Sequence, residues 1–237
     1  VIEFSLEDFL RTTSTNITLI TVPYTRFSAE ELEALKTFVS KGGRLVVMDD
    51  FGYGNQVLEY LGVQARFTND SMLADPVFNY RNCRLPIVRN VDYQNVSEIV
   101  LNYASTILLM EEARIIANSS SYSYLDANFN GVWDEGESVG PFPVAVELDY
   151  GNGSIVLVSD PSIGINGMIG MGDNLGFIKS ITGGRRVVID ESHVPGSMHD
   201  EVKKTVFAVR SMLSREYVFP FIVVGLIYVS LRKLWKG

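Results

Sequence analysis

The chain has 237 residues, which is enough for one sizeable α/β domain. Its formal net charge of −8 argues against nucleic-acid binding, because phosphate contacts require basic patches. The single cysteine, Cys83, excludes an intrachain disulfide and a cysteine-based zinc cage. The two histidines, His193 and His199, are too few for a histidine-rich transition-metal site.

The first quarter of the chain alternates strand and helix patterns, which predicts a parallel α/β sheet. A β-branched run at 17–24 is typical of a buried strand. Ser28 and Glu31 have the spacing of a capping box, so a helix is expected from Ser28 to Gly42. A second strand is expected at 44–50, and a short helix at 56–61.

The pattern between 63 and 118 is less regular and contains short strand candidates at 85–88 and 99–109. We expect this stretch to be an elaboration packed against the sheet. After it, the turn Y-G-N-G at 150–153 predicts a hairpin between two apolar runs. The further expected elements are strands at 144–149, 154–159 and 185–190, a helix at 175–181 and a last soluble helix from Asp200.

Residues 126–137 read D-A-N-F-N-G-V-W-D-E-G-E and match the calcium-loop pattern D-x-[DN]-x-[DN]-G-x5-E. Ca²⁺ needs six to eight oxygen ligands, and Gly131 permits the sharp bend between them. The alternative is a polar turn, which the same composition favours. The predicted ligands are Asp126, Asn128, Asn130, the carbonyl of Val132, Asp134 and the bidentate Glu137.

The flanks of this loop argue against a calcium sensor. A sensor needs an amphipathic helix on each side of the loop. Here a polar and aromatic stretch at 118–125 precedes the loop, and Pro141 and Pro143 follow it. We therefore expect calcium as a structural cofactor that staples a long connection.

Polar side chains follow three of the predicted strands. In open parallel sheets, ligands bind beyond the carboxyl ends of the strands, so these groups predict a ligand crevice. Converging carboxylates there would bind a cation or perform acid/base chemistry. The alternative is that such side chains cap loops and helices. The crevice residues are Asp49, Asp50, Asn55, Asp160, Ser162, Asp190, Glu191 and His193.

Neither candidate nucleophile has the expected surroundings. Ser162 could pair with His193, but it lies in D-P-S-I-G rather than in a G-x-S-x-G elbow. Cys83 lies in an irregular segment with no strand-turn-helix elbow around it. The sequence therefore predicts neither a serine hydrolase nor a cysteine-dependent glutaminase.

An uncharged run begins at Tyr217 and ends at Leu231, and the basic pair Arg232 and Lys233 follows at once. This pattern predicts a single-pass membrane anchor with a short cytoplasmic tail, and the alternative is a buried core helix. The expected domains are an extracytoplasmic α/β domain at 1–215 and the anchor at 216–237. Since the chain starts at Val1 without an initiator methionine, we expect an N-terminal targeting segment to be missing.

Five N-x-[ST] sequons agree with an extracytoplasmic placement of the first 215 residues. Together they support that orientation without proving it. The sequons begin at Asn16, Asn69, Asn95, Asn118 and Asn152.

Several segments, taken in order, resemble an uncharacterised family of membrane-anchored archaeal and bacterial proteins. The soluble domain of that family is similar to class I glutamine amidotransferases, so the resemblance implies a flavodoxin-like parallel sheet. The amidotransferase cysteine has no counterpart at the expected turn, and the first strand and helix of such a fold would have to be compressed into 1–10. The segments are G-G-R-L-V-V-M-D-D-F-G-Y-G-N at 42–55, G-P-F-P-V at 140–144, V-S-D-P-S at 158–162, G-D-N at 172–174 and D-E-x-H at 190–193.

These observations favour a non-catalytic, membrane-anchored extracytoplasmic domain that binds a ligand or a partner. The candidate partner is an envelope or transporter protein, and no nucleic acid is expected. The alternative is a hydrolase or amidotransferase-like enzyme that uses the strand-end carboxylates and His193.

Overall fold

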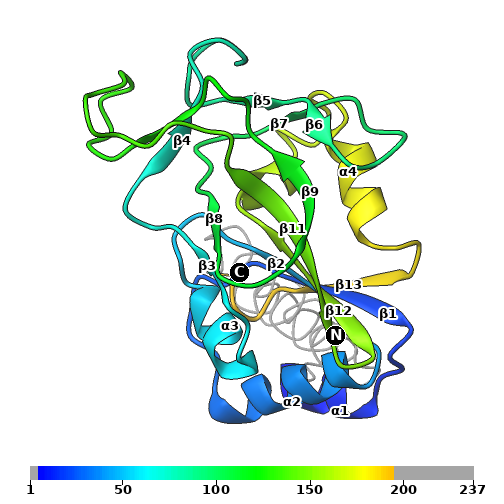
Figure 1. Ribbon diagram of the computed structural model, residues 1–237. Coiled ribbons are helices and arrows are strands. Elements are labelled where there is room, and N and C mark those ends of the chain that lie inside the picture. The colour runs from blue at the N-terminus through cyan, green and yellow to red at the C-terminus, as the bar shows by residue number, and fades with distance from the viewer. Residues whose placement is uncertain (1–4, 195–237) are drawn as a thin grey trace, which may run out of the picture. The chain divides into compact units, whose positions relative to one another are not determined.

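The computed structural model describes residues 5–194, which are built around a seven-stranded sheet of order β13-β1-β2-β12-β11-β9-β6 (Figure 1). The first four strands in this order run parallel, and the pairings of β12 with β11, β11 with β9 and β9 with β6 are antiparallel. In the order of the sheet, the strands are β13 (Arg186–Asp190), β1 (Ile17–Thr21), β2 (Arg44–Met48), β12 (Gly153–Val158), β11 (Pro143–Tyr150), β9 (Arg114–Asn118) and β6 (Asn90–Val91).

The predicted α/β class is therefore confirmed, and the sheet is mixed, with the predicted parallel strands on one side and antiparallel pairings on the other. The hairpin that joins β11 to β12 was predicted from its Y-G-N-G turn, and any such hairpin adds an antiparallel neighbour to the sheet. The finer assignment to a flavodoxin-like fold stays a prediction.

Helices cover both faces of the sheet. On one face lie α1 (Leu6–Thr12), α2 (Ala29–Ser40) and α3 (Asn55–Leu61), which gather at the bottom of Figure 1. On the other face lies α4 (Asn174–Ile181). Successive side chains of a strand point to opposite faces, so β2 contributes to both cores.

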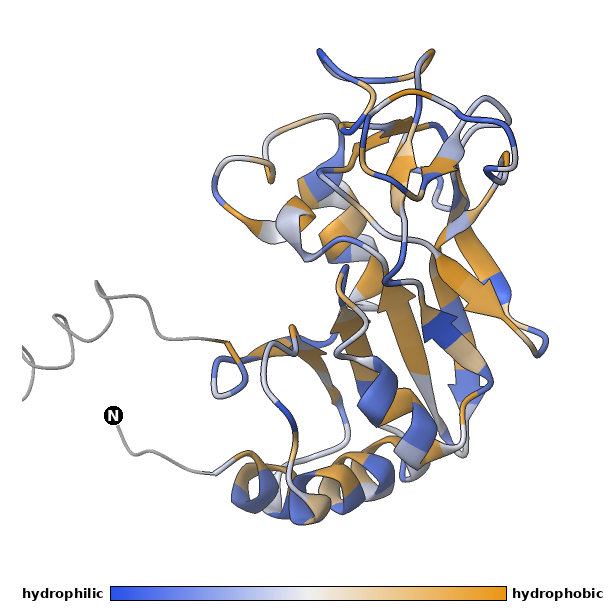
Figure 2. Ribbon diagram, turned by 90° about the vertical axis from the view of Figure 1, so that its left-hand side faces the viewer, coloured by the Kyte–Doolittle hydropathy of each residue, from blue (hydrophilic) through white to orange (hydrophobic). Residues whose placement is uncertain are grey.

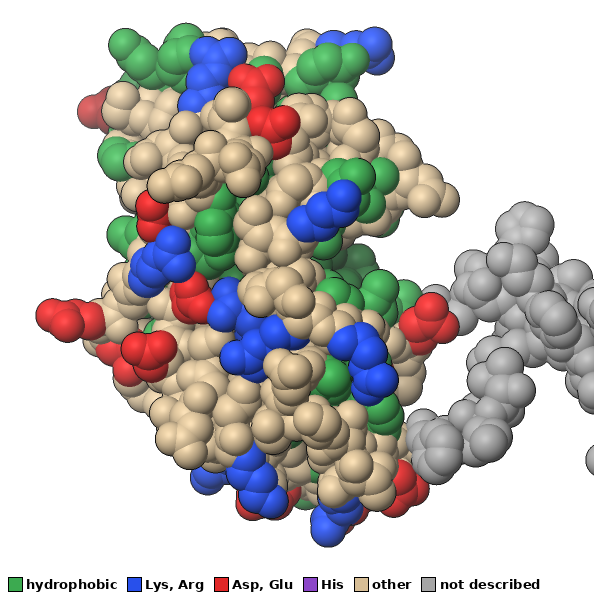
Figure 3. All heavy atoms as spheres, turned by 90° about the vertical axis from the view of Figure 1, so that its right-hand side faces the viewer, with side chains coloured by type: hydrophobic (Ala, Val, Ile, Leu, Met, Phe, Trp, Pro, Cys, Tyr) green, Lys and Arg blue, Asp and Glu red, His purple; other side chains and the backbone are tan. Residues whose placement is uncertain are grey.

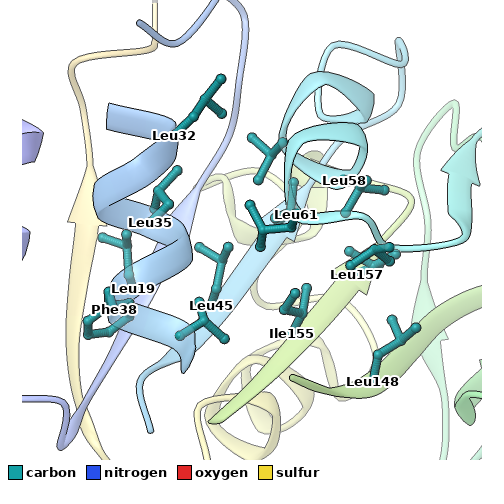
Figure 4. Packing of buried hydrophobic residues seen from close by; sticks show 14 of the residues in the cluster. Leu19, Leu32, Leu35, Phe38, Leu45, Leu58, Leu61, Leu148, Ile155 and Leu157 are labelled. Carbon is teal, nitrogen blue, oxygen red and sulfur yellow. The ribbon is translucent and has the colours of Figure 1, made fainter. Parts of the chain in front are cut away.

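The core under α1 to α3 is formed by aliphatic side chains of the helices and of the central strands (Figure 4). Leu35 of α2 and Leu45 of β2 are fully buried there. Colouring by hydropathy shows the same division, with apolar residues along the strands and polar residues on the outer sides of the helices (Figure 2). Burial of this apolar area is the main stabilising contribution to the domain.

Local signals account for the helix ends. The capping box of α2 is confirmed: the Ser28 hydroxyl accepts from the Glu31 N–H, and the Glu31 carboxylate accepts from the Ser28 N–H at 2.8 Å. Gly62 ends α3 with a left-handed φ of +76°. Helix α1 was not predicted, although Ser5 caps it by accepting from the Asp8 N–H at 3.1 Å.

The stretch between α3 and β11 forms short two-stranded ladders above the sheet. Leu73, Val88 and Ile99 of this stretch join the core of Val46 and Met48 on the α4 face, whereas Ala65, Phe67 and Ile107 join the core under α1 to α3. The strand expected at 99–109 is interrupted and divides between two ladders. The paired strands are β3 (Ala65–Phe67) with β8 (Ile107–Leu109), β4 (Met72–Ala74) with β10 (Tyr124–Asp126), and β5 (Ile87–Val88) with β7 (Ile99–Val100).

No helix within residues 5–194 has both the length and the apolar character needed to cross a bilayer. The predicted anchor at 217–231, the boundary at 215 and the helix expected from Asp200 all lie outside the described residues.

Candidate functional site

The carboxyl ends of the parallel strands bring most of the predicted crevice residues to one edge of the sheet. Asp49 and Asp50 follow β2, Asp160 follows β12, and Asp190 ends β13. The parallel register of these strands with β1 places their ends side by side. We call this edge the strand-end face.

Asp49 holds the loop that leads into α3. It is 2% exposed, and its carboxylate accepts from the backbone N–H groups of Phe51 at 2.8 Å, Gly52 at 3.1 Å and Gly54 at 2.5 Å. Burial raises the pKa of Asp49, and these hydrogen bonds oppose that rise. Its acceptor sites are therefore used within the loop.

Asn55 also has a structural role. Its side-chain amide bonds the backbone of Phe67 in both directions, accepting from the N–H at 2.8 Å and donating to the carbonyl at 3.0 Å. This pair of bonds joins the start of α3 to β3. Asn55 is thus a brace for the insertion rather than a free crevice group.

Asp160 fixes a turn and part of the insertion. It is fully buried and accepts from the backbone N–H groups of Asn102 at 2.6 Å and Ser162 at 2.7 Å. It caps the short 3-10 helix η1 (Pro161–Gly164) on which Ser162 lies. Burial raises the pKa of Asp160 to about 7.

Asp190 and His193 form a buried pair at the end of β13. The Asp190 carboxylate accepts from the Thr21 hydroxyl at 2.9 Å and lies 2.8 Å from His193 Nδ1. His193 stacks on Phe27 at 3.7 Å, and its Nε2 lies 3.5 Å from the Glu31 carboxylate. Both ring nitrogens are therefore directed at acids.

The pKa values of this pair follow from that geometry. Burial lowers the pKa of His193, but the bond to Asp190 and the charge of Glu31 outweigh it and raise the pKa above 6.5. Burial raises the pKa of Asp190, but hydrogen bonds from His193 and Ser192 bring it below 3.8. The neighbouring Glu191 is exposed.

The structure does not bring Ser162 and His193 together. Their strands, β12 and β13, are separated by β1 and β2, so the strand ends are roughly 14 Å apart at the usual spacing of ~4.8 Å. Cys83 lies elsewhere, and its thiol reaches the Gly131 carbonyl at 3.4 Å in the predicted calcium loop.

Asp50 differs from every other carboxylate of the strand-end face. Its Oδ1 is shielded from solvent and has no hydrogen-bond partner among the described residues. Burial and the adjacent Asp49 raise the pKa of Asp50 to about 6. A buried acceptor without a donor is costly, and a bound water or ion is one way in which such an acceptor is satisfied.

Three aromatic side chains lie beside Asp50, and we call them the aromatic row: Tyr24, Phe51 and Tyr53. The ring centroids are 6.3 Å apart from Tyr24 to Phe51 and 6.4 Å apart from Phe51 to Tyr53. Phe51 is 58% exposed and Tyr53 is 52% exposed. These residues were not predicted as site residues from the sequence, although Phe51 and Tyr53 closely follow the predicted acids.

The potential around the aromatic row is negative. Burial raises the pKa of Tyr24, and the charges of Asp50, Asp49 and Asp160 raise it further. A positive charge placed there would relieve this repulsion.

The predicted calcium loop closes on itself. Asp126 is fully buried, and its carboxylate accepts from the N–H groups of Asn130 at 3.0 Å and Gly131 at 2.8 Å. Glu137 accepts from the N–H groups of Ala127 at 2.9 Å and Asp134 at 3.0 Å. The first and last predicted ligands therefore face the inside of the loop.

The middle ligands meet there as well. The side-chain amides of Asn128 and Asn130 donate to the Asp134 carboxylate at 2.6 and 2.8 Å. Gly131 has a φ of +78°, as the predicted bend requires. No group of three or more His, Cys, Asp and Glu side chains within residues 5–194 is arranged to hold a metal. Because amide and carbonyl oxygens also bind Ca²⁺, the calcium loop stays a prediction.

Cavities and surface charges elsewhere do not involve the predicted site residues. A cavity of about 820 Å³ lies between 62–63, 111–114 and 147–150. On the side of the molecule seen in Figure 3, acidic and basic side chains are interspersed. The strand-end face and the loop at 126–137 therefore remain the two candidate sites.

Comparison with known proteins gives a family and a fold. The profile of a domain of unknown function (DUF4350) matches residues 5–182. No curated protein is significantly similar in sequence. Among solved structures, the mmIFT52 N-terminal domain is similar, with 16% identity, a TM-score of 0.55, and coverage of 76% of this chain and 81% of that domain.

Two further structures are less similar. A β-galactosidase from Bacillus circulans sp. alkalophilus has 14% identity and a TM-score of 0.43, with 72% of this chain and 23% of the enzyme covered. A cytoplasmic protein of Salmonella typhimurium LT2 has 14% identity and a TM-score of 0.44, with 66% of this chain and 61% of that protein covered. At 16% identity, the similarity to the mmIFT52 N-terminal domain concerns the fold alone.

Proposed function

Because the chain belongs to the DUF4350 family, whose function is unknown, we propose a function from its own residues. We propose a non-catalytic domain that binds a small organic cation on the strand-end face. The observation that carries the proposal is the shielded Oδ1 of Asp50, which has no hydrogen-bond partner among the described residues.

The chemistry of the face favours an ammonium ligand. An ammonium group that reaches Oδ1 of Asp50, which requires the groups that shield this oxygen to move, would satisfy it and offset the charges of the neighbouring carboxylates. The exposed rings of Phe51 and Tyr53 offer the aromatic faces to which cations are attracted. A neutral sugar could use the rings and the acceptor, but it would gain nothing from the negative potential.

Methylammonium, whose N–H groups can donate to the Asp50 carboxylate, and glucose are suitable probes of this proposal. We expect methylammonium to shift the NMR signals of the Tyr24 and Phe51 rings in a saturable way, and glucose to leave them unchanged. Phe51→Ala and Asp50→Asn should weaken the effect. Tyr122→Ala, which removes an aromatic side chain that is 58% exposed outside both candidate sites, is the matched control. Saturable shifts with glucose alone, or with neither probe, would contradict the proposed ligand class.

The enzymatic alternative has less support. Asp50 and Asp160, with pKa values of about 6 and 7, could exchange protons near neutral pH. However, the carboxylates of Asp49, Asp160 and Asp190 already accept hydrogen bonds within the protein. Ser162 is also far from His193, because two strands separate β12 from β13. We take the proposed resemblance to class I amidotransferases, which have a flavodoxin-like sheet, to reflect common ancestry. Glutaminase activity is not part of the proposal.

Calcium binding at 126–137 is the second part of the proposal. Asp126, Asn128, Asn130, Asp134 and Glu137 would hold the ion together with the Val132 carbonyl, and the ion would staple the loop. Thermal unfolding with Ca²⁺ and with a chelator tests this, because a ligand of the native state raises the midpoint. Glu137→Gln should abolish most of the difference, and Glu135→Gln, two positions away, should preserve it. Equal unfolding midpoints of the wild-type protein with Ca²⁺ and with the chelator would contradict calcium binding by this loop.

The last part of the proposal is a membrane anchor between Tyr217 and Leu231, with the α/β domain outside the cytoplasm. This part depends on the sequence alone. An envelope or transporter protein is the proposed partner in the membrane. Protease added to intact cells should digest the domain and spare a C-terminal tag. Protection of the whole domain would reverse the proposed orientation.

A further inference from the structure

The five sequons differ in how the fold presents them. N-glycosylation requires access both to the asparagine amide and to the hydroxyl two residues later, which is why the motif specifies both. The structure describes all five sites, so each can be classified by the burial and bonding of these two side chains.

Three sequons have a hydroxyl that is committed to the fold. Thr18, which completes the sequon of Asn16, is fully buried and donates to the Thr182 carbonyl at 2.7 Å. Ser120 donates to the buried Asp75 at 2.5 Å. The hydroxyl of Ser154 accepts from Arg44, which is 8% exposed, at 2.7 Å.

The sequon of Asn95 is presented in the opposite way. Asn95 lies in a turn in which the Val96 N–H donates to the Tyr93 carbonyl at 3.1 Å, and both Asn95 and Ser97 are exposed. The backbone N–H of Ser97 donates to Asp173 at 2.7 Å, and Val96 is 6% exposed. The loop is thus anchored by its backbone and its middle residue, while the two reacting side chains face solvent.

The sequon of Asn69 is intermediate. Asn69 is exposed, but its side chain lies against Gly52 of the strand-end loop, close enough that a Cβ on Gly52 would come within 3.0 Å of it. Ser71 is half-buried, and its hydroxyl donates to Asp70 at 3.2 Å. We expect slower modification at this site.

We propose that Asn95 is an acceptor site for N-glycosylation of the folded chain, with Asn69 as a weaker second site. In the reaction, the side-chain nitrogen of Asn95 forms a bond to the anomeric carbon of a glycosyl diphospholipid. The bond from that carbon to the phosphate oxygen breaks, the diphospholipid leaves, and the amide loses one proton.

Incubation of the purified full-length chain in detergent with an oligosaccharyltransferase and a glycosyl diphospholipid tests the proposal. We expect peptide mass spectrometry to find the glycan on Asn95, less on Asn69, and at least tenfold less on Asn16, Asn118 and Asn152. A urea-unfolded sample, diluted into the same reaction, should lose this selectivity.

Two variants separate the site from the fold. Asn95→Gln and Ser97→Ala should each remove the main product, and Asn152→Gln should leave it unchanged. Modification of folded chain at Asn152 or Asn16 to the same extent as at Asn95 would overturn the proposal. An unmodified Asn95 in a folded chain whose unfolded form is modified would overturn it as well.

Discussion

The ends of β13 and β2 each carry two consecutive acidic residues, and yet they differ in chemistry. At the end of β13, Asp190 receives hydrogen bonds from Thr21 and Ser192 and faces the His193 ring. At the end of β2, Asp50 keeps an oxygen that no described donor reaches. A carboxylate that accepts hydrogen bonds from its own protein has a structural role. A carboxylate oxygen that has no donor in the protein is available to a ligand.

The largest expected effect on the free energy of unfolding is at the end of β13. Asp190→Ala leaves His193 buried without its main partner, and breaking a buried pair in this way costs about 3–5 kcal/mol of unfolding free energy. Denaturant titration at pH 6 measures the loss. Glu191→Ala, at an exposed neighbouring position, is the control and should change stability little. A wild-type midpoint for Asp190→Ala would mean that the pair does not hold the β13 end.

The same pair gives stability a defined pH window. The pKa of Asp190 is lowered, so its contribution is present above its ordinary 3.8 and is lost as the pH falls through the folded value. The pKa of His193 is raised, so its contribution is complete below 6.5 and is lost as the pH rises through the folded value. The pair should therefore stabilise most between about pH 4 and 6.5, and His193→Ala should flatten that part of the profile.

The next effect sharpens the contrast between two adjacent residues. Asp49→Ala removes the acceptor of three backbone N–H groups, and we expect a cost of about 2–3 kcal/mol. Hydrogen exchange of the Gly52 and Gly54 amides should speed up in parallel. If these amides keep their protection, then Asp49 is not what holds the loop.

Unlike Asp49→Ala, the substitution Asp50→Asn should raise the free energy of unfolding and so stabilise the protein. The raised pKa of Asp50 means that its penalty is absent below 3.8 and is complete above about 6. Because the side chain is partly exposed, solvent screening reduces the expected gain to about 1–2 kcal/mol at pH 8. Melting curves from pH 4 to 8 should converge at the acid end, and a destabilised variant at pH 8 would show that Asp50 has a structural partner.

The smallest effect concerns Ser159, which is fully buried and whose hydroxyl has no partner among the described residues. Ser159→Ala removes that unsatisfied group, so we expect a gain of about 0–1 kcal/mol. Ser105→Ala, at a neighbouring buried hydroxyl that donates to the Asp49 carbonyl at 3.4 Å, is the comparison and should not be stabilising. A clear loss in Ser159→Ala would point to a bond that a water molecule completes.

Local patterns predict much of this fold. The β-branched runs of β1, β2 and β12, the capping box of α2 and the glycine after α3 all act through neighbours in the chain, so the sequence reveals them. Strand order is different, because the pairing of β11 with β9 joins segments that the chain separates by a long connection. No local pattern specifies that partner, so the pairings of β9 with β11 and β6 were not predicted, although the β11–β12 hairpin was.

The candidate site was predictable only as a group. Strand ends identify Asp49, Asp50, Asp160 and Asp190 as candidates, but the sequence does not reveal which carboxylates find a donor. Asp160 depends on the Asn102 N–H from the insertion, and no motif signals that contact. The exposure of Phe51 and Tyr53 likewise depends on how the loop after β2 is held by Asp49.

The central claim is that Asp50 is the carboxylate of the strand-end face with a shielded oxygen that no described donor reaches. Carbon NMR of the aspartate carboxyl groups, followed from pH 3 to 8, measures this directly. We predict that Asp50 titrates at about 6, that Asp190 titrates below 3.8, and that methylammonium lowers the pKa of Asp50 because a bound cation favours the charged form. An Asp50 that titrates at its ordinary value of 3.8 and does not respond to the cation would contradict the account.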